Sequence, residues 1–509
     1  MTTTYSSDFP FDDLQGLLRF GHRHLKDSCF LLLRVADAKA AKQWLADAPV
    51  SSAIQNGSRP KTALQIAFSV AGLRALGLRE SVIGDFSDEF ISGMAGHESR
   101  SRRLGDVDGN SPEYWAWGGG EQQTPHVLLL LYAEAGKIAP WRKKAQGKPF
   151  AEAFELLAEL PTDDLGAIEP FGFVDGISQP ELDWAGTQAI DSHGRDGFSN
   201  LLAVGEVVLG YRNEYGQYTV RPLIDPMHDP GAALLPAAED RPGLKDFARN
   251  GSYLVLRQLG QDVPGFWQFI DKASGGDATQ REQLAAAMVG RQRDGRPLLP
   301  PAAAEIPGIP ADDSLNSFNY LSDPAGMRCP IGAHVRRANP RSGDMPSASG
   351  CIFSRLLKIL GFGLNRHDQD LIASTRFHRL LRRGRPYGPL LTPEQAVKAD
   401  APAAERGLQF ICLVANISRQ FEFVQNAWMV NSKFAGLQQE RDPLLAHRQP
   451  LNDGTPTDQF HRPDPAGPVQ TVAHLPQFIS VRGGAYFFMP GLSAIRYLAA
   501  LPTQGDQPS

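Results

Sequence analysis

Phe171-Gly-Phe-Val-Asp-Gly-Ile-Ser-Gln-Pro180 places one carboxylate, Asp175, between apolar residues and two glycines. A carboxylate in such surroundings is costly to bury unless it has a partner or a task. Gly172 and Gly176 have no Cβ, so the backbone can turn sharply and approach something flat and bulky. Taken alone, an Asp-Gly pair more often marks a β-turn. The segment therefore needs support from elsewhere in the chain.

Two further segments supply that support, Cys329-Pro-Ile-Gly-Ala-His-Val-Arg-Arg-Ala-Asn-Pro-Arg341 and His378-Arg-Leu-Leu-Arg-Arg-Gly-Arg-Pro-Tyr-Gly388. In the first, His334 follows small residues that would let a planar ligand approach. Arg336 and Arg341 come after it, and guanidinium groups suit the carboxylates of a haem. The alternative is a basic surface turn that holds phosphate or acidic side chains. The residues alone leave these two interpretations open.

Composition limits the class of protein. The chain has 509 residues, 42% of them hydrophobic and 21% charged, which is typical of a globular protein large enough for two domains. The net charge of -5 is spread along the chain, which argues against nucleic-acid binding. No apolar stretch is long enough to span a membrane, and no secretory signal is seen, so we expect a cytoplasmic location. Four scattered cysteines make a disulfide framework or a zinc site unlikely.

The first half alternates strands and helices in an order that suits a ferredoxin-like sheet with helices on one face. We expect strands at 29–35, at 62–69 and around Leu128, and helices at 38–48, 70–76 and 150–160. The second half repeats this plan at greater length. We expect strands at 252–258, 379–381, 408–413 and 485–489, and helices at 263–273 and 418–428.

Residues 222–243 are rich in Pro, Ala and Asp, which marks a loop or linker between the halves. The sequence thus predicts an α+β protein of two ferredoxin-like domains with antiparallel sheets, residues 1–221 and 244–509. Three long loops at 277–319, 342–368 and 436–471 interrupt the second domain, and loops of this length usually carry function or cover something. A cofactor of the size of haem would explain them.

Together the three segments resemble the dye-decolorizing peroxidases, a family of haem enzymes, and similarity extends from about Leu14 to Leu501. The resemblance implies that His334 is the proximal iron ligand and that Asp175 and Arg382 lie on the distal face. The extra residues at 342–368 resemble the longer bacterial members. Short bacterial members have Asn two positions after the distal arginine, whereas this chain has Gly384, so the distal set is mostly Asp175 and Arg382.

The same resemblance implies further contacts to one haem b per chain, enclosed between the two domains. Those contacts are Gly176, Ile177, Ser178, Arg336, Asn339, Pro340, Arg341 and Arg382. The second ring nitrogen of His334 needs an acceptor, because that hydrogen bond sets the basicity of the ligand. Asp442 is the first candidate and Glu422 the second. Tyr387 resembles a surface tyrosine that carries a radical in some relatives, and Trp428 is a second candidate relay to bulky substrates.

The implied activity is reduction of hydrogen peroxide coupled to one-electron oxidation of bulky aromatic dyes and phenols. Asp175 would act as general base and then acid, and Arg382 would stabilise the charge on the leaving oxygen. Hydrogen peroxide and aromatic reductants are the expected partners, with a homo-oligomer possible. Two alternatives remain open: a haem-handling protein that carries haem or removes its iron, and a non-haem protein that binds an anionic metabolite.

Overall fold

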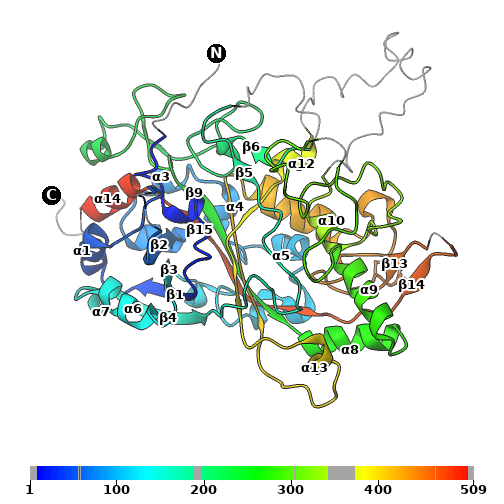
Figure 1. Cartoon of the computed structure of the whole chain (residues 1–509). Coiled ribbons are helices and arrows are strands. Elements are labelled where there is room, and N and C mark those ends of the chain that lie inside the picture. Colours follow the sequence, from blue (N-terminus) through cyan, green and yellow to red (C-terminus); the bar gives the residue numbers. More distant parts are fainter. Residues whose placement is uncertain are drawn as a thin grey trace, which may run out of the picture.

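An antiparallel sheet runs through the middle of the molecule, with helices on its outside (Figure 1). The computed structural model describes residues 9–55, 57, 59–187, 198–302, 305–341, 373–464 and 466–502. Within these residues the strands follow the order β10-β12-β9-β15-β2-β3-β1-β4, and β11 also pairs with β12. Buried apolar residues form two large clusters that cover the two faces of this sheet.

The N-terminal half supplies four strands and a set of short helices. The strands are β1 (Asp27–Val35), β2 (Thr62–Phe68), β3 (Val127–Ala133) and β4 (Phe154–Pro161). Apolar residues fill β1 and β3, and both strands are buried, as expected for the centre of a sheet that is covered on both faces. The helices are α1 (Ala38–Asp47), α2 (Val70–Ala75), α3 (Glu80–Ile83), α4 (Asp88–Ser92), α5 (Glu98–Leu104), α6 (Ile138–Gln146) and α7 (Phe150–Ala153).

The C-terminal half builds the other side of the sheet from β9 (Ser252–Gln261), β10 (Leu381–Arg382), β11 (Arg385–Tyr387), β12 (Gly407–Val414) and β15 (Ile479–Met489). Two successive π-helical segments, Ser418–Glu422 and Val424–Val430, follow β12. The helices are α8 (Val263–Ala273), α9 (Ala278–Val289), α10 (His334–Ala338), α12 (Ser374–Phe377), α13 (Pro393–Ala396) and α14 (Leu492–Ala500). Short pairs complete the list: β5 (Glu181–Leu182) with β6 (Leu201–Leu202), β7 (Leu223–Ile224) with β8 (Lys245–Asp246), and β13 (Phe460–Arg462) with β14 (Gln470–Val472).

The two halves meet where β15 runs beside β2, with Phe488 opposite Phe68. Each half is an antiparallel sheet with peripheral helices, so the expected α+β architecture of two ferredoxin-like halves is confirmed. The bounds 1–221, 222–243 and 244–509 stay a prediction. Residues 222–243 do not form an unattached linker. They contain β7, and their side chains are bound to neighbouring parts of the chain.

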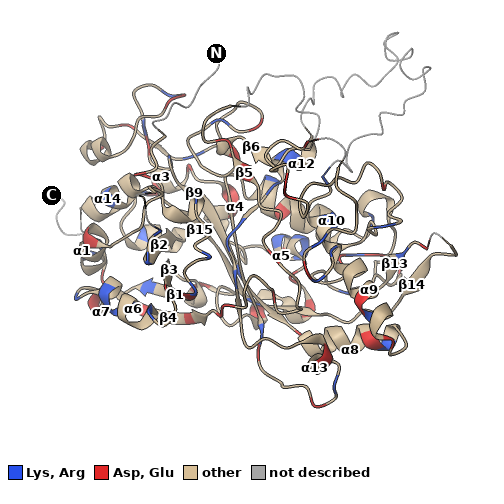
Figure 2. Ribbon diagram, viewed as in Figure 1, with Lys and Arg blue, Asp and Glu red and all other residues tan. Residues whose placement is uncertain are grey.

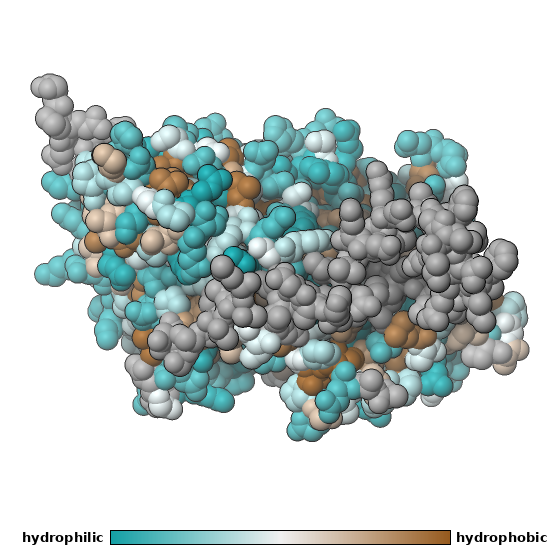
Figure 3. All heavy atoms as spheres, turned by 90° about the horizontal axis from the view of Figure 1, so that it is seen from above, coloured by the Kyte–Doolittle hydropathy of each residue, from teal (hydrophilic) through white to brown (hydrophobic). Residues whose placement is uncertain are grey.

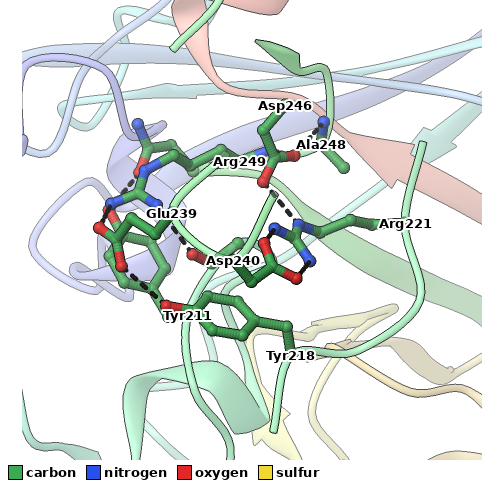
Figure 4. A network of polar contacts seen from close by, with 10 residues as sticks. Tyr211, Tyr218, Arg221, Glu239, Asp240, Asp246, Ala248 and Arg249 are labelled. Atoms are coloured by element: carbon green, nitrogen blue, oxygen red, sulfur yellow. Dashed lines mark hydrogen bonds and ion pairs between the residues drawn. The ribbon is translucent and has the colours of Figure 1, made fainter. Parts of the chain in front are cut away.

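Those side chains form the polar network of Figure 4. Arg221 pairs with both Asp240 and Asp246, and it is almost fully buried. Arg249 pairs with Glu239, which also accepts a hydrogen bond from Tyr218 Oη at 2.9 Å. Because Asp246 lies in β8, just before β9, the network fastens the 222–243 segment to the start of the central strand of the second half.

Three expectations about local structure were wrong. Residues 150–160 do not form one helix: α7 ends at Ala153 and β4 begins at Phe154. Glu, Leu and Ala there favour a helix, but β1 would otherwise present an unpaired edge, and pairing with β4 satisfies it. Residues 277–319 contain α9 and residues 436–471 contain β13, so neither range is one long loop. The expected loop at 342–368 lies outside the described residues.

Lysine, arginine, aspartate and glutamate are interspersed along the ribbon (Figure 2). On the face seen in Figure 3, hydrophobic residues form small groups among hydrophilic ones. None of the described helices is both long and apolar enough to cross a bilayer.

Candidate active site

A large cavity lies on the C-terminal part of the sheet and receives the three segments that the sequence singled out. It holds about 1600 Å³ of free space including its mouth. Its walls are mostly apolar. They come from the 171–178 segment, β9, α10, β12, the π-helical segments and the start of β15, and they include Phe171, Phe173, Val174, Leu259, Val335, Leu380, Phe410, Phe421 and Val424.

The 171–178 segment packs against α8 and is hydrogen-bonded to Glu169, and these contacts position Asp175 at the cavity. Phe171 and Phe173 pack against the aromatic side of α8, with Phe173 stacked on Trp267 at 6.3 Å between ring centroids. Glu169 accepts hydrogen bonds from the backbone N–H groups of both phenylalanines, at 3.0 Å each. Gly176 has φ +79°, a conformation that residues with a Cβ rarely adopt, and this turns the chain immediately after Asp175.

Asp175 and Arg382 form an ion pair across 207 positions of the chain, with Arg382 Nη1 donating to Asp175 Oδ1 at 2.9 Å. Both side chains line the cavity. Burial acts to raise the pKa of Asp175, but the Arg382 guanidinium and the Gly176 N–H outweigh it and hold that pKa below its usual value. Asp175 is therefore ionised at neutral pH and can accept a proton. Gln179 fixes the Arg382 backbone, because its Oε1 accepts from Arg382 N at 2.9 Å.

His334 enters the same cavity from the first position of α10. Its Nδ1 lies 3.0 Å from Asp442 Oδ2, and Asp442 is fully buried. This contact leaves Nε2 as the ring nitrogen available to a ligand. Gly332, two positions earlier in the small-residue segment, does not line the cavity. A Cβ there would lie 1.6 Å from Glu440 Oε1, so the glycine makes room for the Glu440 carboxylate.

The arginines after His334 do not occupy the expected place. Arg336 donates to Asp323 and to the Cys329 carbonyl, and Arg341 donates to the Asn316 and Phe318 carbonyls. Neither guanidinium group lines the cavity, and neither does Pro340, although Arg341 Nη2 also donates to the Oγ of the cavity-lining Ser178 at 3.3 Å. Four of the other expected contacts do line the cavity: Gly176, Ile177, Ser178 and Asn339.

Two arginines that the sequence analysis missed take the cavity positions instead. Arg291, just after α9, donates to Ser178 Oγ at 2.9 Å, and Arg379 donates to Asn200 Oδ1 at 2.8 Å. Both line the cavity, and neither has a carboxylate partner among the described residues. Burial lowers the pKa of Arg291 and lowers that of Arg379 to about 9. Arg379 lies three positions before Arg382, in a segment that was already marked as basic.

These residues fit a haem. Two buried guanidinium groups without an anionic partner are costly in themselves, and the two propionate carboxylates of a haem would neutralise them. Asn339 Oδ1, on the same wall, is buried without a hydrogen-bond partner among the described residues. The apolar walls suit the porphyrin ring, and His334 offers a free nitrogen. Arg257 on β9 also lines the cavity, but it is paired with Asp106.

The remaining candidates lie nearby without reaching the cavity wall. Glu422 does not contact His334, because it pairs with Arg100 at 2.8 Å and accepts from Tyr486 Oη at 3.0 Å. Tyr387, expected at the surface, is buried, and its hydroxyl donates to the Leu259 carbonyl at 3.2 Å. Trp428 is buried under α10, where its carbonyl accepts from Arg337 Nη1 at 2.8 Å.

Comparison with known proteins gives one consistent result. Peroxidase 2 of the fungus Mycetinis scorodonius is 30% identical, over 97% of this chain and 88% of its own length. The dye-decolorizing peroxidase msp1 of the same fungus is 29% identical, over 96% and 88%. The solved structure of the Auricularia auricula-judae dye-decolorizing peroxidase in complex with imidazole superposes with a TM-score of 0.69 and 25% identity, over 97% of this chain and all of that one. No protein-family model matches the chain.

Proposed function

This chain belongs to the dye-decolorizing peroxidases, which are haem-dependent enzymes, and from that premise we propose that His334 holds the haem iron while Asp175 and Arg382 act on hydrogen peroxide. The enzyme reduces hydrogen peroxide and oxidises dyes and phenolic compounds. The assignment of roles to individual residues is the part proposed here. Nothing in the fold or the cavity favours a protein that only carries or handles haem.

Haem, when bound, supplies the iron at which the peroxide O–O bond is broken and the electrons for that cleavage. His334 would bind it through Nε2, with Asp442 holding the imidazole by its other nitrogen. Arg291 and Arg379 would bind the propionates, since both guanidinium groups lack a carboxylate partner among the described residues. Asn339, Ser178 and Ile177 would complete the contacts.

Asp175 would transfer the proton that peroxide cleavage requires. One oxygen of hydrogen peroxide must lose a proton and the other must gain one as the bond breaks. Asp175 is ionised because Arg382 lowers its pKa. Its Oδ2, which does not take part in the ion pair, can therefore accept the proton from the peroxide oxygen that must lose one. The protonated carboxyl can then return it to the leaving oxygen.

Arg382 would stabilise the negative charge that develops on the leaving oxygen. Its guanidinium is held by the ion pair with Asp175, and its backbone N–H donates to Gln179 Oε1. A cation that is already in place stabilises the transition state without further reorganisation. It also keeps the proton acceptor charged in the resting enzyme.

A single observation carries this proposal. His334 and the Asp175–Arg382 pair come from three distant segments and line one cavity, although nothing in their local sequence requires them to meet. The test is the absorption spectrum of the purified protein and of His334→Ala. We expect a Soret band of a histidine-bound haem in the wild type, its loss or displacement in the variant, and partial recovery with added imidazole. An unchanged band in His334→Ala would remove this residue from the role.

Hydrogen peroxide and an aromatic reductant are the reactants of the family, and this chain is taken to share them. A homo-oligomeric assembly and a cytoplasmic location remain predictions from the sequence. Size-exclusion chromatography with light scattering and cell fractionation would test them.

A further inference from the structure

A second cavity adjoins the large cavity that is proposed to hold the haem, here called the haem cavity. The two cavities meet at Asp175 and Arg382, here called the distal pair. The second cavity holds about 960 Å³ of free space including its mouth, and we call it the side cavity. Its walls come from residues 21–26, 163–169, 175, 179, 382–386 and 408. Glu169, Asp175, Arg382 and Leu408 line both cavities. A small molecule in the side cavity therefore reaches Asp175 and Arg382 from another direction than one in the haem cavity.

The side cavity has an excess of positive charge that its own acids do not neutralise. Besides Arg382, its cations are Arg23, Lys26, Arg383 and Arg385. Lys26 pairs with Asp164 at 3.1 Å. The other three donate only to backbone carbonyls among the described residues: Arg23 to Asp175, Arg383 to Leu17, Leu18 and Arg382, and Arg385 to His22 and Leu25.

The acids of the cavity leave this excess in place. Asp163 accepts from the Gly388 N–H at 2.7 Å and Asp175 is paired with Arg382. Glu169 accepts from Gln261 Nε2 at 2.8 Å besides the two backbone donors. Burial raises the pKa of Glu169 to about 7, so at neutral pH it carries only part of a negative charge. Three guanidinium groups thus face the carboxylates of Asp163 and Glu169, so an excess of positive charge remains even at a pH where Glu169 is ionised.

Arg23 stands where the two cavities join. Its Nη2 donates to the Asp175 carbonyl at 3.2 Å and fills the space beside Gly176, where a Cβ would lie 1.4 Å from that nitrogen. The side chain is exposed and has this one long hydrogen bond among the described residues, so it can swing away at small cost. Arg383 and Arg385, in contrast, are each held by at least two carbonyls.

We infer that the side cavity is an entry route for small monoanions and that Arg23 is the residue that selects them at the distal pair. The inference rests on the proposed role of Asp175 and Arg382. A monoanion that enters is attracted by Arg23 and Arg383, whereas a neutral molecule gains nothing from them. The Arg23 guanidinium also narrows the passage beside Gly176. Removing it should therefore slow the entry of anions and leave neutral ligands unaffected or faster.

The experiment uses the haem-loaded ferric protein and two probes, azide as the anion and imidazole, at about pH 8 where it is mostly neutral, as the uncharged ligand. Stopped-flow absorption of the Soret band measures the association rate of each. Arg23→Gln removes the charge. Lys39→Gln is the matched control, because Lys39 is an exposed cation on α1, which packs against α7 and α14 and lines neither cavity. Arg23→Lys keeps the charge but not the fork of the guanidinium.

In Arg23→Gln at low ionic strength we expect azide association to slow about threefold to tenfold, the range of a single charge close to a narrow route. Added salt should remove the difference, since screening weakens the attraction in the wild type. Lys39→Gln should behave as wild type, Arg23→Lys should recover most of the azide rate, and imidazole association should not slow in any variant. An azide rate in Arg23→Gln equal to wild type would overturn the inference, and so would an equal slowing of azide and imidazole. These rates do not depend on whether Asp175 is the proton acceptor, so a failure of that role would be seen separately, in the peroxide reaction of Asp175→Asn.

Discussion

Asp442 Oδ2 lies 3.0 Å from His334 Nδ1, and the carboxylate of Asp442 is also held in place by the protein backbone. Its other oxygen accepts from the backbone N–H groups of Leu444 and Leu445, at 3.0 and 2.7 Å. The carboxylate is fully buried, and the attraction of His334 and these backbone donors together outweigh burial and keep the pKa of Asp442 low. A charged acceptor therefore sets both the orientation of the ring and the electron density on Nε2.

Replacing Asp442 with asparagine should preserve the shape and remove the charge. The imidazole becomes a weaker donor to the iron, so we expect a more positive reduction potential and a loss of about 10- to 100-fold in haem affinity or activity. A spectroelectrochemical titration measures the potential. Glu422→Gln is the control, because Glu422 was the second candidate acceptor but contacts Arg100 and Tyr486 instead of His334. If the two variants had the same potential as wild type, Asp442 would not tune the ligand.

The distal pair should control the reaction with peroxide without controlling haem binding. Asp175→Asn removes the proton acceptor, and Arg382→Leu removes the cation, so each should slow the reaction about 100-fold or more. Stopped-flow mixing of the ferric enzyme with hydrogen peroxide gives the rate, and the Soret band before mixing shows that haem is still bound. Rates equal to wild type in both variants would mean that another group moves the proton.

The pH dependence of the same reaction gives a finer test. Arg382 holds the pKa of Asp175 below its usual value, so the wild-type rate should stay constant from neutral pH well into the acid range. In Arg382→Leu the lowering influence is lost while burial remains, so the pKa of Asp175 should rise and the acid limb should move to higher pH. A variant that is slower at every pH, with no displacement of its acid limb, would contradict this electrostatic coupling.

The sequence predicted the central parts of this protein better than its edges. Strands such as β1 and β12 were found because their runs of apolar residues are buried on both faces. β4 was missed because its residues favour a helix, and only the unpaired edge of β1, a tertiary feature, makes it a strand. At the site, His334, Asp175 and Arg382 were identified from motifs, but Arg336 and Arg341 were chosen over Arg291 and Arg379. Adjacency in the chain could not show that the short helix α10 turns Arg336 toward Asp323 and away from the cavity.

Tyr387 gives a prediction about bulky substrates. A dye with several rings that stays outside the cavity would need electrons relayed through the protein. Tyr387 is buried, and its hydroxyl donates to the carbonyl of Leu259, a residue that lines the haem cavity. In Tyr387→Phe we expect slower turnover of an anthraquinone dye and an unchanged rate with peroxide and with a small phenol. Trp428→Phe provides the comparison for the second candidate. Equal retention of dye and phenol turnover in both variants would exclude both relays.

His22 gives a prediction about stability that does not depend on haem. It is buried, and neither ring nitrogen has a hydrogen-bond partner among the described residues. Burial, together with nearby His24, Arg385 and Arg383, lowers its pKa to about 3. Below pH 6.5 the unfolded chain therefore binds a proton at His22 that the folded chain does not bind, so the stability falls as the pH decreases. Between pH 7.5 and 5 this amounts to about 2 kcal/mol.

His22→Phe should abolish that part of the pH dependence. The ring of His22 lies 5.2 Å from that of Tyr132, a contact that phenylalanine can keep. Any change in packing is the same at both pH values, so it cancels when the two are compared. Denaturant unfolding of wild type and variant at pH 7.5 and pH 5 gives four free energies. We expect the wild type to lose about 2 kcal/mol more than the variant as the pH falls, because all other titrating groups are common to both proteins. Parallel losses would mean that His22 is protonated in the folded protein, and the unpartnered nitrogens would then need a hydrogen-bonded water or anion beside Arg383 and Arg385.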